Sequence, residues 1–490
     1  MRFRKPPPPL IDPNLPPRKS RSIHDEEEAK GSTPPPQEAI EWHLTYVAEA
    51  YLPSHAEGLA DTLTRLGWSS ERWKPAPDLV PSMREGSLGG AWSSLKTLLP
   101  EGTHTFFGQS ISSRLPDGVS SIRLRLWSVT PSLTMLVAVC EWDEYWGDAL
   151  DRIVRTDYQT AWIPIRNGHQ IYGPVSRKEL ELKRRRREMH RRLASWLTER
   201  VPGAFEDLGV PHPAVDVVST AIARPFEDEE EPFVLYDYRR ILSLNRRFMT
   251  GTSPSLPGWR LALPERDEPP TLTLAGRTAD VFDERALGIY GSEVSRWVLG
   301  NYMEHRVEDL VASWATLRLL DGMRASLASA RDRAPETDES SVAFARRLSG
   351  DVSTVLRRSA DAGAFCADVR RHPKELGPLV VLRGLDFTMT YGFDERADLL
   401  RSWWSRQVKE ESARVAELEQ DQRERLSRSV EFAGLGQSIR TQNQMVFLTI
   451  ALLMFAVAAI VLSVVQLSSS RGDTQSRITV SSPAPTRSAR

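Results

Sequence analysis

Cysteine is nearly absent from the 490-residue sequence, which contains only Cys140 and Cys366. Two cysteines this far apart exclude a framework of several disulfides and leave at most one bridge. So low a cysteine content is typical of a protein in a reducing compartment. We therefore do not expect disulfides to organise the fold.

An excess of charge of one sign is also missing. The 64 Lys and Arg residues are balanced by 65 Asp and Glu residues, and the formal net charge is -1. No overall field therefore favours nucleic acid or an acidic membrane surface, and such a role would depend on a local patch. Nucleic acid is an unlikely partner on this ground.

Recognisable catalytic and cofactor motifs are missing as well. The sequence has no G-x-x-x-x-G-K-[ST] phosphate loop, no H-E-x-x-H, no G-x-S-x-G, no C-x-x-C and no G-x-G-x-x-G. Its nine histidines are scattered, with no pair at a metal-ligand spacing. We expect no cofactor and no metal, and we favour a binding protein over an enzyme. The catalytic residues of any enzyme built on this chain are unknown, because catalytic groups meet in space rather than along the sequence.

A secretory signal is not visible at the start of the chain, where a basic, proline-rich stretch lacks an apolar core of about 7 to 15 residues. We therefore expect the 444 residues before the apolar run at 445–467 to be cytoplasmic, with a short C-terminal tail on the opposite side of a cell membrane. Three arginines lie within about twenty residues on each side of this run, so positive charge does not decide the orientation.

The run at 445–467 is the most distinctive feature that the sequence does contain. It has 23 residues without a charge or a proline. At about 1.5 Å per residue, a helix of this length reaches roughly 35 Å and crosses a hydrocarbon core of about 30 Å. We predict a single C-terminal transmembrane helix here.

Both ends of the chain have the composition of disordered segments. Residues 1–40 contain ten prolines and a run of mixed charge, and residues 468–490 are mostly polar. Such segments bury too little apolar surface to offset the loss of chain entropy. We predict a disordered proline-rich arm and a disordered tail.

Residues 41–172 have the alternation and turn signals of an α+β domain. In the predicted strand at 121–128, Ile122, Leu124 and Leu126 alternate with two arginines, which indicates one buried and one solvent-facing side. The strand at 133–141 is apolar throughout, which is typical of a central strand. The order predicts an antiparallel sheet with helices on one face. The predicted elements are a strand from Trp42, a helix over 54–66, strands over 109–115, 121–128 and 133–141, and a helix over 143–158.

Residues 173–206 contain a basic amphipathic helix, predicted over 176–200 with a capping box at Ser176 and Glu179. In one interpretation the basic residues are only the solvent-facing side of a helix whose apolar stripe packs on the sheet. In the other, they bind lipid headgroups, nucleic acid phosphates or an acidic partner. The lack of interleaved aromatic residues disfavours single-stranded nucleic acid. The candidate residues for contact with an anionic surface are Lys183, Arg184, Arg185, Arg186, Arg187, Arg191 and Arg192.

The remaining segments divide by pattern. Residues 207–285 read as a mixed region of short strands, with an acidic run at 227–231 that either lies against the basic helix or forms a solvated loop. Residues 286–393 are predominantly helical in pattern, with a short apolar segment at 379–385. Residues 394–444 form a predicted stalk helix, in which apolar positions 404, 415 and 426 are eleven apart, a spacing that gives a nearly straight seam.

The predicted span has one face of small and weakly polar residues, which allow helices to approach closely. The candidate helix-association residues are Thr449, Ala456, Ala459 and Ser463. A homo-oligomer formed through stalk and span is therefore expected, although alanine and serine are common in any span. The stalk with its Gln442-Asn443 entry into the membrane resembles CorA-type magnesium channels over about sixty residues. The chain has neither their second span nor a Gly-Met-Asn sequence, so neither pore nor selectivity is implied.

The sequence thus predicts an α+β cytoplasmic region, an antiparallel sheet with helices, followed by an α-helical region, a long stalk helix and one C-terminal transmembrane helix. The favoured function is a single-pass membrane-anchored scaffold or regulatory protein that binds unidentified partner proteins at the inner membrane face. One alternative is a membrane-tethered hydrolase or nuclease with a site not visible in the sequence. Another is an accessory subunit of a bacterial defence or signalling complex.

Overall fold

A computed structural model describes the chain over residues 32–68, 92–103, 110–165, 168–222, 238, 242, 249–254, 256–264, 271–281, 296–332, 357–371, 387–391 and 394–470. The chain divides into two compact units. The first comprises Met1–Ala334 with Ser353–Gln422, and the second comprises Pro335–Val352 with Arg423–Arg490.

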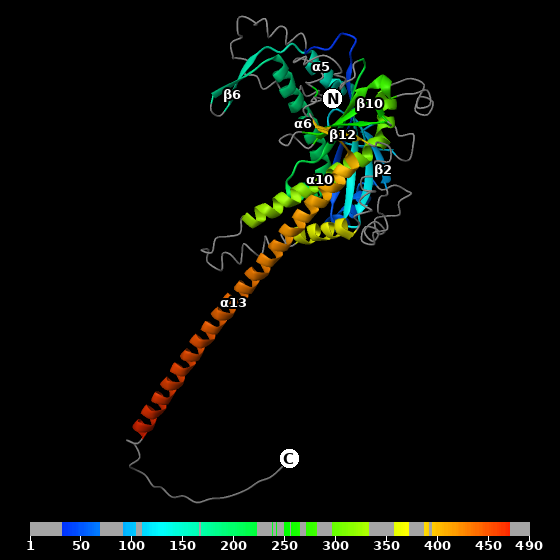
Figure 1. Cartoon of the computed structure of the whole chain (residues 1–490). Helices are drawn as coiled ribbons and strands as arrows, with labels where there is room; N and C mark the ends of the chain where they lie inside the picture. The colour runs from blue at the N-terminus through cyan, green and yellow to red at the C-terminus, as the bar shows by residue number, and fades with distance from the viewer. Residues whose placement is uncertain are drawn as a thin grey trace, which may run out of the picture. The chain divides into compact units, whose positions relative to one another are not determined.

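The first unit is built on one large sheet (Figure 1), whose eleven described strands have the order β13-β12-β9-β10-β11-β8-β1-β5-β4-β2-β3. A separate hairpin joins β6 (Ala161–Ile165) to β7 (Gly168–Tyr172). The strands of the large sheet are β1 (Ile40–Tyr51), β2 (Trp92–Pro100), β3 (Ser110–Ser113), β4 (Val119–Thr130), β5 (Leu133–Trp142), β8 (Ala214–Thr220), β9 (Met249–Ser253), β10 (Leu256–Ala262), β11 (Thr271–Arg277), β12 (Thr388–Tyr391) and β13 (Asp394–Leu399).

The sheet is mixed, which confirms an α+β fold but corrects the prediction of a purely antiparallel sheet. Strand β8 pairs with β11 in parallel, and β2 pairs with β3 in parallel. The strands also come from segments that were predicted as helical, since β12 lies within the predicted helical region 286–393 and β13 within the predicted stalk, and both join the same sheet through β9. Local patterns identify strands but carry no information about partners more than a hundred residues away.

Helices cover both faces of the sheet, although the helices of the predicted domain 41–172 pack on one face, as expected. One face packs against α2 (Ala56–Arg65), α4 (Glu144–Gly147), α5 (Ala149–Arg155) and α6 (Pro174–Thr198). The other packs against α7 (Ala204–Leu208), α10 (Arg296–Asp332), the helical residues 357–371 and the first part of α13 (Leu400–Ser470). Each face therefore has its own apolar core.

The continuous apolar pattern of β5 follows from this double coverage. Met135, Val137 and Val139 belong to one core, whereas Leu136 and Ala138 belong to the other. The strand lies between β1 and β4, so the prediction that it is an interior strand is confirmed.

Strand β1 changes the face of its side chains at an irregularity. Trp42 and Leu44 are two residues apart and should share a face, yet Trp42 lies in one core and Leu44 in the other. The pairing of β1 with β8 shifts register between these two residues, and such a bulge reverses the alternation.

The arginines of β4 do not face water, which corrects the prediction for this strand. Arg123 Nε lies 2.8 Å from Glu304 Oε2 of α10, and Arg125 Nη2 lies 2.6 Å from Glu304 Oε1. Helix α10 covers this side of the sheet, and the side chain of Glu304 is only 4% exposed. The charges are accommodated because they are paired with each other.

The described chain begins at Ser32, and residues 32–40 pack against the folded unit although they fell within the predicted arm 1–40. Ser32 is fully buried, and Lys178 Nζ of α6 donates to its carbonyl and its hydroxyl, each at 3.1 Å. The carboxylate of Glu38 accepts from the backbone N–H groups of Ala221 and Ile222 at the end of β8. Disorder of residues 1–31 stays a prediction.

Helix α13 begins at Leu400, directly after β13, so the first six residues of the predicted stalk form a strand. Leu400, Trp404, Val408 and Val415 are buried in the core of the first unit. The first part of the predicted stalk is therefore a core helix, and residues 400–422 belong to the sheet unit.

The predicted span 445–467 lies within the same continuous helix, coloured from orange to red in Figure 1. Among the residues that the structure describes, no helix is long and apolar enough to cross a membrane. The side chains from residue 461 onward are outside the described part, as are the acidic run 227–231, the segment 379–385 and the tail 471–490.

Candidate functional site

The basic helix α6 packs its apolar stripe onto the sheet, as one of the interpretations of its sequence requires. Leu182, Met189, Leu193 and Leu197 are buried in the core that this helix covers. The helix begins at Pro174 after Gly173, two residues before the predicted capping box. Proline is well suited to the first helical position, because its missing N–H has no partner there in any helix.

One basic side chain of α6 is bound to the sheet through a buried carboxylate. Asp216 on β8 is fully buried and lies 2.8 Å from Arg186 Nη2 and 2.9 Å from His190 Nε2. Thr45 Oγ1 donates to the same carboxylate at 2.9 Å. Burial alone raises the pKa of Asp216, but the charges of His190 and Arg186 outweigh it and hold this pKa below its ordinary value. Arg186 is thus turned inward.

Three more candidate arginines are paired with acidic residues of their own helix. Arg184 makes two hydrogen bonds to Glu181, at 2.9 and 2.6 Å. Arg191 and Arg192 share the carboxylate of Glu188, at 2.9 and 2.7 Å. These charges are largely neutralised within α6, which reduces what they offer to an external anion.

The other candidates differ in their surroundings. Arg187 is exposed, and its Nε donates to the carbonyl oxygen of Lys183 at 3.2 Å. Arg185 is half-buried, with its guanidinium carbon 4.7 Å from the centre of the Trp146 ring. Sequence reasoning identified the basic cluster, but the aromatic residue that contacts it comes from α4, which the sequence did not connect with α6.

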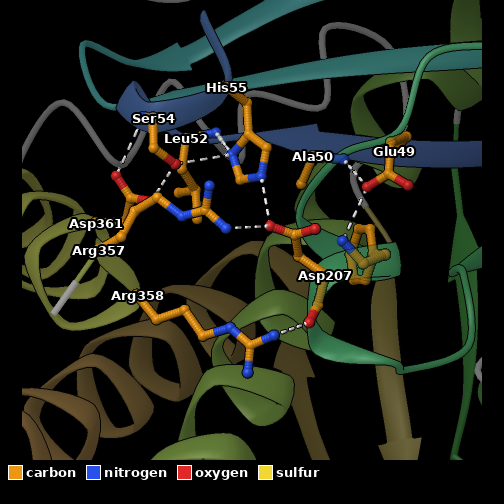
Figure 2. A network of polar contacts seen from close by, with 10 residues as sticks. Glu49, Ala50, Leu52, Ser54, His55, Asp207, Arg357, Arg358 and Asp361 are labelled. Atoms are coloured by element: carbon orange, nitrogen blue, oxygen red, sulfur yellow. Dashed lines mark hydrogen bonds and ion pairs between the residues drawn. The ribbon is translucent and has the colours of Figure 1, made fainter. Parts of the chain in front are cut away.

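A second polar cluster joins three segments that are far apart in the sequence (Figure 2). Ser54 Oγ donates to Asp361 Oδ2 at 2.5 Å, and His55 Nε2 lies 3.2 Å from Asp207 Oδ2. Ser54 and His55 belong to a short 3-10 helix, Pro53–His55, Asp207 belongs to α7, and Asp361 belongs to the helical residues 357–371. No sequence signal links these positions.

Serine, histidine and aspartate occur together in this cluster, but their hydrogen bonds are not those of a nucleophile and its base. The Ser54 hydroxyl donates to Asp361 Oδ2 at 2.5 Å, whereas its oxygen lies 3.4 Å from His55 Nδ1. His55 Nδ1 also accepts the backbone N–H of Leu52 at 3.3 Å, so the longer contact with Ser54 shares this nitrogen with a backbone donor. The adjacent cavity has a volume of about 20 Å³, enough for roughly one water molecule. The cluster therefore serves to hold the segments together.

The neighbouring carboxylate of Glu49 has the same structural character. It is fully buried and accepts hydrogen bonds from the backbone N–H groups of Ala50 and Phe205, each at 2.9 Å, and lies 2.7 Å from His212 Nε2. Gly203 passes so close that an added Cβ would lie 2.6 Å from the carbonyl oxygen of Ala50. These contacts fix α7 on β1.

Reactive cysteines and metal-binding clusters are not found in the described residues. No group of three His, Cys, Asp or Glu residues is placed there to hold a metal ion. Burial raises the pKa of both thiols, that of Cys366 to about 11, so neither is a thiolate at neutral pH.

The larger cavity of the sheet unit lies between the helical residues 357–371 and α13, and has a volume of about 540 Å³. Val369 and Ser412 are buried at its base, and Arg370, Lys409 and Glu417 are exposed around it. A lining that is mostly polar and charged differs from the predominantly apolar lining of small-molecule pockets.

The predicted helix-association residues lie on the C-terminal part of α13. Thr449 Oγ1 donates to the carbonyl oxygen of Met445 at 2.7 Å, so its hydroxyl is satisfied within the helix. Ala456 and Ala459 are exposed, and the side chain of Ser463 is outside the described residues. Association through this face stays a prediction.

Comparison of the chain with protein-family models, with curated proteins and with solved structures finds no match.

Proposed function

We propose that the protein is a single-pass, membrane-anchored scaffold or regulatory protein that binds partner proteins through its sheet unit. The observation that carries the proposal is the apolar surface of α13. Ten large apolar side chains between Met445 and Ile460 are 51 to 77% exposed. Water-exposed apolar surface of this extent is unfavourable, and a helix that is apolar on all sides is typical of a membrane span.

The charge-free run of 23 residues supports the same assignment, because its length matches a hydrocarbon core. The exposed positions are also not confined to one side of the helix. Phe447 is 77% exposed and Leu452, five residues later, is 63% exposed. Five residues correspond to about 140° around a helix. Acyl chains cover every side of a helix, whereas a single partner helix covers one.

Binding is favoured over catalysis by the polar groups of the sheet unit. The buried carboxylates of Asp216 and Glu49 are each occupied by several internal donors. The Ser54 and His55 cluster borders a cavity of only about 20 Å³. The open cavity of about 540 Å³ beside α13 is the feature that suits a protein partner. The bulk of the chain would then face the cytoplasm.

The anchor is tested by fractionating cells that produce the full chain. We expect the protein to resist alkaline carbonate extraction, and the double substitution Leu453→Arg with Val457→Arg to release most of it. Two charges at the centre of a span cost about 5 to 7 kcal/mol on insertion scales. The matched control places arginine at two exposed positions of the sheet unit, Glu410 and Asp421. Release of the unsubstituted protein by carbonate would contradict the anchor.

The scaffold role needs its own measurement. Crosslinking in intact membranes, followed by purification of the full chain, should return the same few proteins from repeated preparations. Substitution of Lys409 and Glu417 beside the larger cavity should reduce their recovery without releasing the chain from the membrane. Steady turnover of a substrate that is lost on changing one residue would favour an enzyme instead.

A further inference from the structure

One arginine of α5 and one in the middle of α6 are held against aromatic rings of α4. The guanidinium carbon of Arg152, on α5, lies 4.2 Å from the centre of the Tyr145 ring. That of Arg185 lies 4.7 Å from the centre of the Trp146 ring. The two rings meet edge to face, with centroids 6.2 Å apart. We call Arg152 and Arg185 the stacked arginine pair.

The stacked arginine pair has no acidic partner among the residues that the structure describes. Arg152 donates one hydrogen bond to the carbonyl oxygen of Tyr145, and Arg185 makes its ring contact without an ion pair. Arg184, Arg191 and Arg192 on the same helix are each hydrogen-bonded to a glutamate, including Arg192, whose guanidinium carbon also lies 4.6 Å from the centre of the Trp146 ring. A guanidinium carries five N–H donors, so most of those of the stacked arginine pair are unused.

The two charges are close enough to affect each other. Burial is the main cause that lowers the pKa of Arg185, and the charges of Arg184 and Arg152 lower it further, against the opposing effect of Glu181. A guanidinium does not lose its proton at neutral pH, so only a nearby negative charge would reduce the repulsion. The rings fix the planes of the cations, which reduces the entropy that a ligand must overcome to bind them.

We propose that the stacked arginine pair is a binding site for a phosphate group. The planar guanidinium fork matches phosphate oxygens in paired hydrogen bonds, and two such forks satisfy several oxygens of one group. Arg152 is exposed and Tyr145 is 49% exposed, so the site is open to solvent. The phosphate comes from a lipid headgroup or from a soluble phosphomonoester, which share this chemistry. The site does not depend on the proposed anchor or on a protein partner.

The test uses the full chain in a neutral detergent and measures binding by isothermal titration calorimetry. The probes are inorganic phosphate, short-chain phosphatidylglycerol and short-chain phosphatidylcholine, with chloride at matched ionic strength as the blank. The test variant is Arg152→Gln with Arg185→Gln. The matched control, Arg187→Gln with Arg191→Gln, removes the same charge from neighbouring exposed positions. Circular dichroism checks that both variants are folded.

We expect the test variant to bind phosphate at least about tenfold more weakly, since hydrogen bonds between charged groups are involved. The control should change binding by less than about threefold. Arg185→Lys should restore only part of the affinity, because an ammonium cannot reproduce the planar fork. Tighter binding of phosphatidylglycerol than of phosphate supports a lipid source, and the reverse supports a soluble ligand. No binding by the unsubstituted chain, or equal losses in both variants, would overturn the proposal.

Discussion

The two ends of α13 place apolar side chains in opposite surroundings. Near its start, Leu400 and Trp404 are fully buried against the sheet. Between Met445 and Ile460, large apolar side chains are exposed over the whole helix surface. In the first part the polypeptide itself covers the apolar surface, and under the proposed function the membrane covers it in the second part. The comparison teaches that similar apolar residues in one uninterrupted helix differ in what covers them, which the sequence pattern alone does not reveal.

The largest expected effect comes from the buried end of the helix. Trp404→Ala should lower the free energy of unfolding of the sheet unit by about 3 to 5 kcal/mol, because it leaves a cavity in a packed core. Leu453→Ala should change it by less than about 0.5 kcal/mol. Guanidinium unfolding of the full chain in detergent, followed by tryptophan fluorescence, measures both. Equal effects would show that the two ends of α13 are not in different surroundings.

A somewhat smaller loss of stability is expected on replacing Asp216, the buried carboxylate under α6. This residue shows that charges buried in the sheet unit are paired with one another. Asp216→Asn should cost about 3 kcal/mol, since it leaves Arg186 and His190 without their counter-charge. The folded pKa of Asp216 is depressed, so its contribution is present above the unfolded value near 3.9 and disappears as the pH falls through the folded pKa. The stability of Asp216→Asn should therefore decrease less than that of the unsubstituted protein as the pH falls. Unfolding curves recorded at several pH values would measure this difference.

The buried lysine should act in the same direction as Asp216, but at the alkaline end of the pH scale. Burial lowers the pKa of Lys178 to about 8, while Asp157 opposes the shift. Between pH 8 and about 10.5 the unfolded chain then binds more protons than the folded one, so stability rises with pH. We expect a gain of about 1 to 3 kcal/mol over this window. In Lys178→Met this rise should be absent, and an unchanged pH profile in that variant would assign the rise to another group.

The smallest expected effect concerns the exposed end of α13. Thr449→Val should change helix stability by less than about 0.5 kcal/mol, because its hydroxyl is bonded only to the carbonyl of Met445.

Replacing Ala456 and Ala459 by leucine should reduce crosslinked dimers in membranes if the small-residue face brings spans together. Unchanged crosslinking yields would contradict the association of spans through this face.

Much of the local structure could be predicted from the sequence, because alternation and helical spacing are local properties. The strand at 133–141, the helix over 54–66 and the amphipathic character of α6 are all present. What failed depended on distant contacts. Arg123 and Arg125 were predicted to face solvent, because their ion-pair partner, Glu304 on α10, is about 180 residues away in the sequence and no local pattern indicates it.

The candidate site shows the same limit. Residues 183 to 192 were recognised as a basic cluster. The pairs of Arg184 with Glu181 and of Arg192 with Glu188 lie three and four residues apart on one helix, but nothing in the sequence shows that Arg185 contacts Trp146. Arg152 escaped notice altogether, since it lies on another helix and belongs to no basic run. The contacts of Arg152 and Arg185 with the rings of α4 depend on tertiary geometry, which spacing along the chain does not encode.

The contrast between the two ends of α13 can be measured directly by cysteine labelling in native membranes. Both native cysteines are buried, so labelling by a membrane-impermeant maleimide reports on an introduced cysteine. The membranes are first broken, so that the reagent reaches their inner face. We predict that Glu410→Cys is labelled rapidly and that Leu453→Cys is labelled only after detergent is added. Labelling of Leu453→Cys at the rate of Glu410→Cys before detergent would contradict the account.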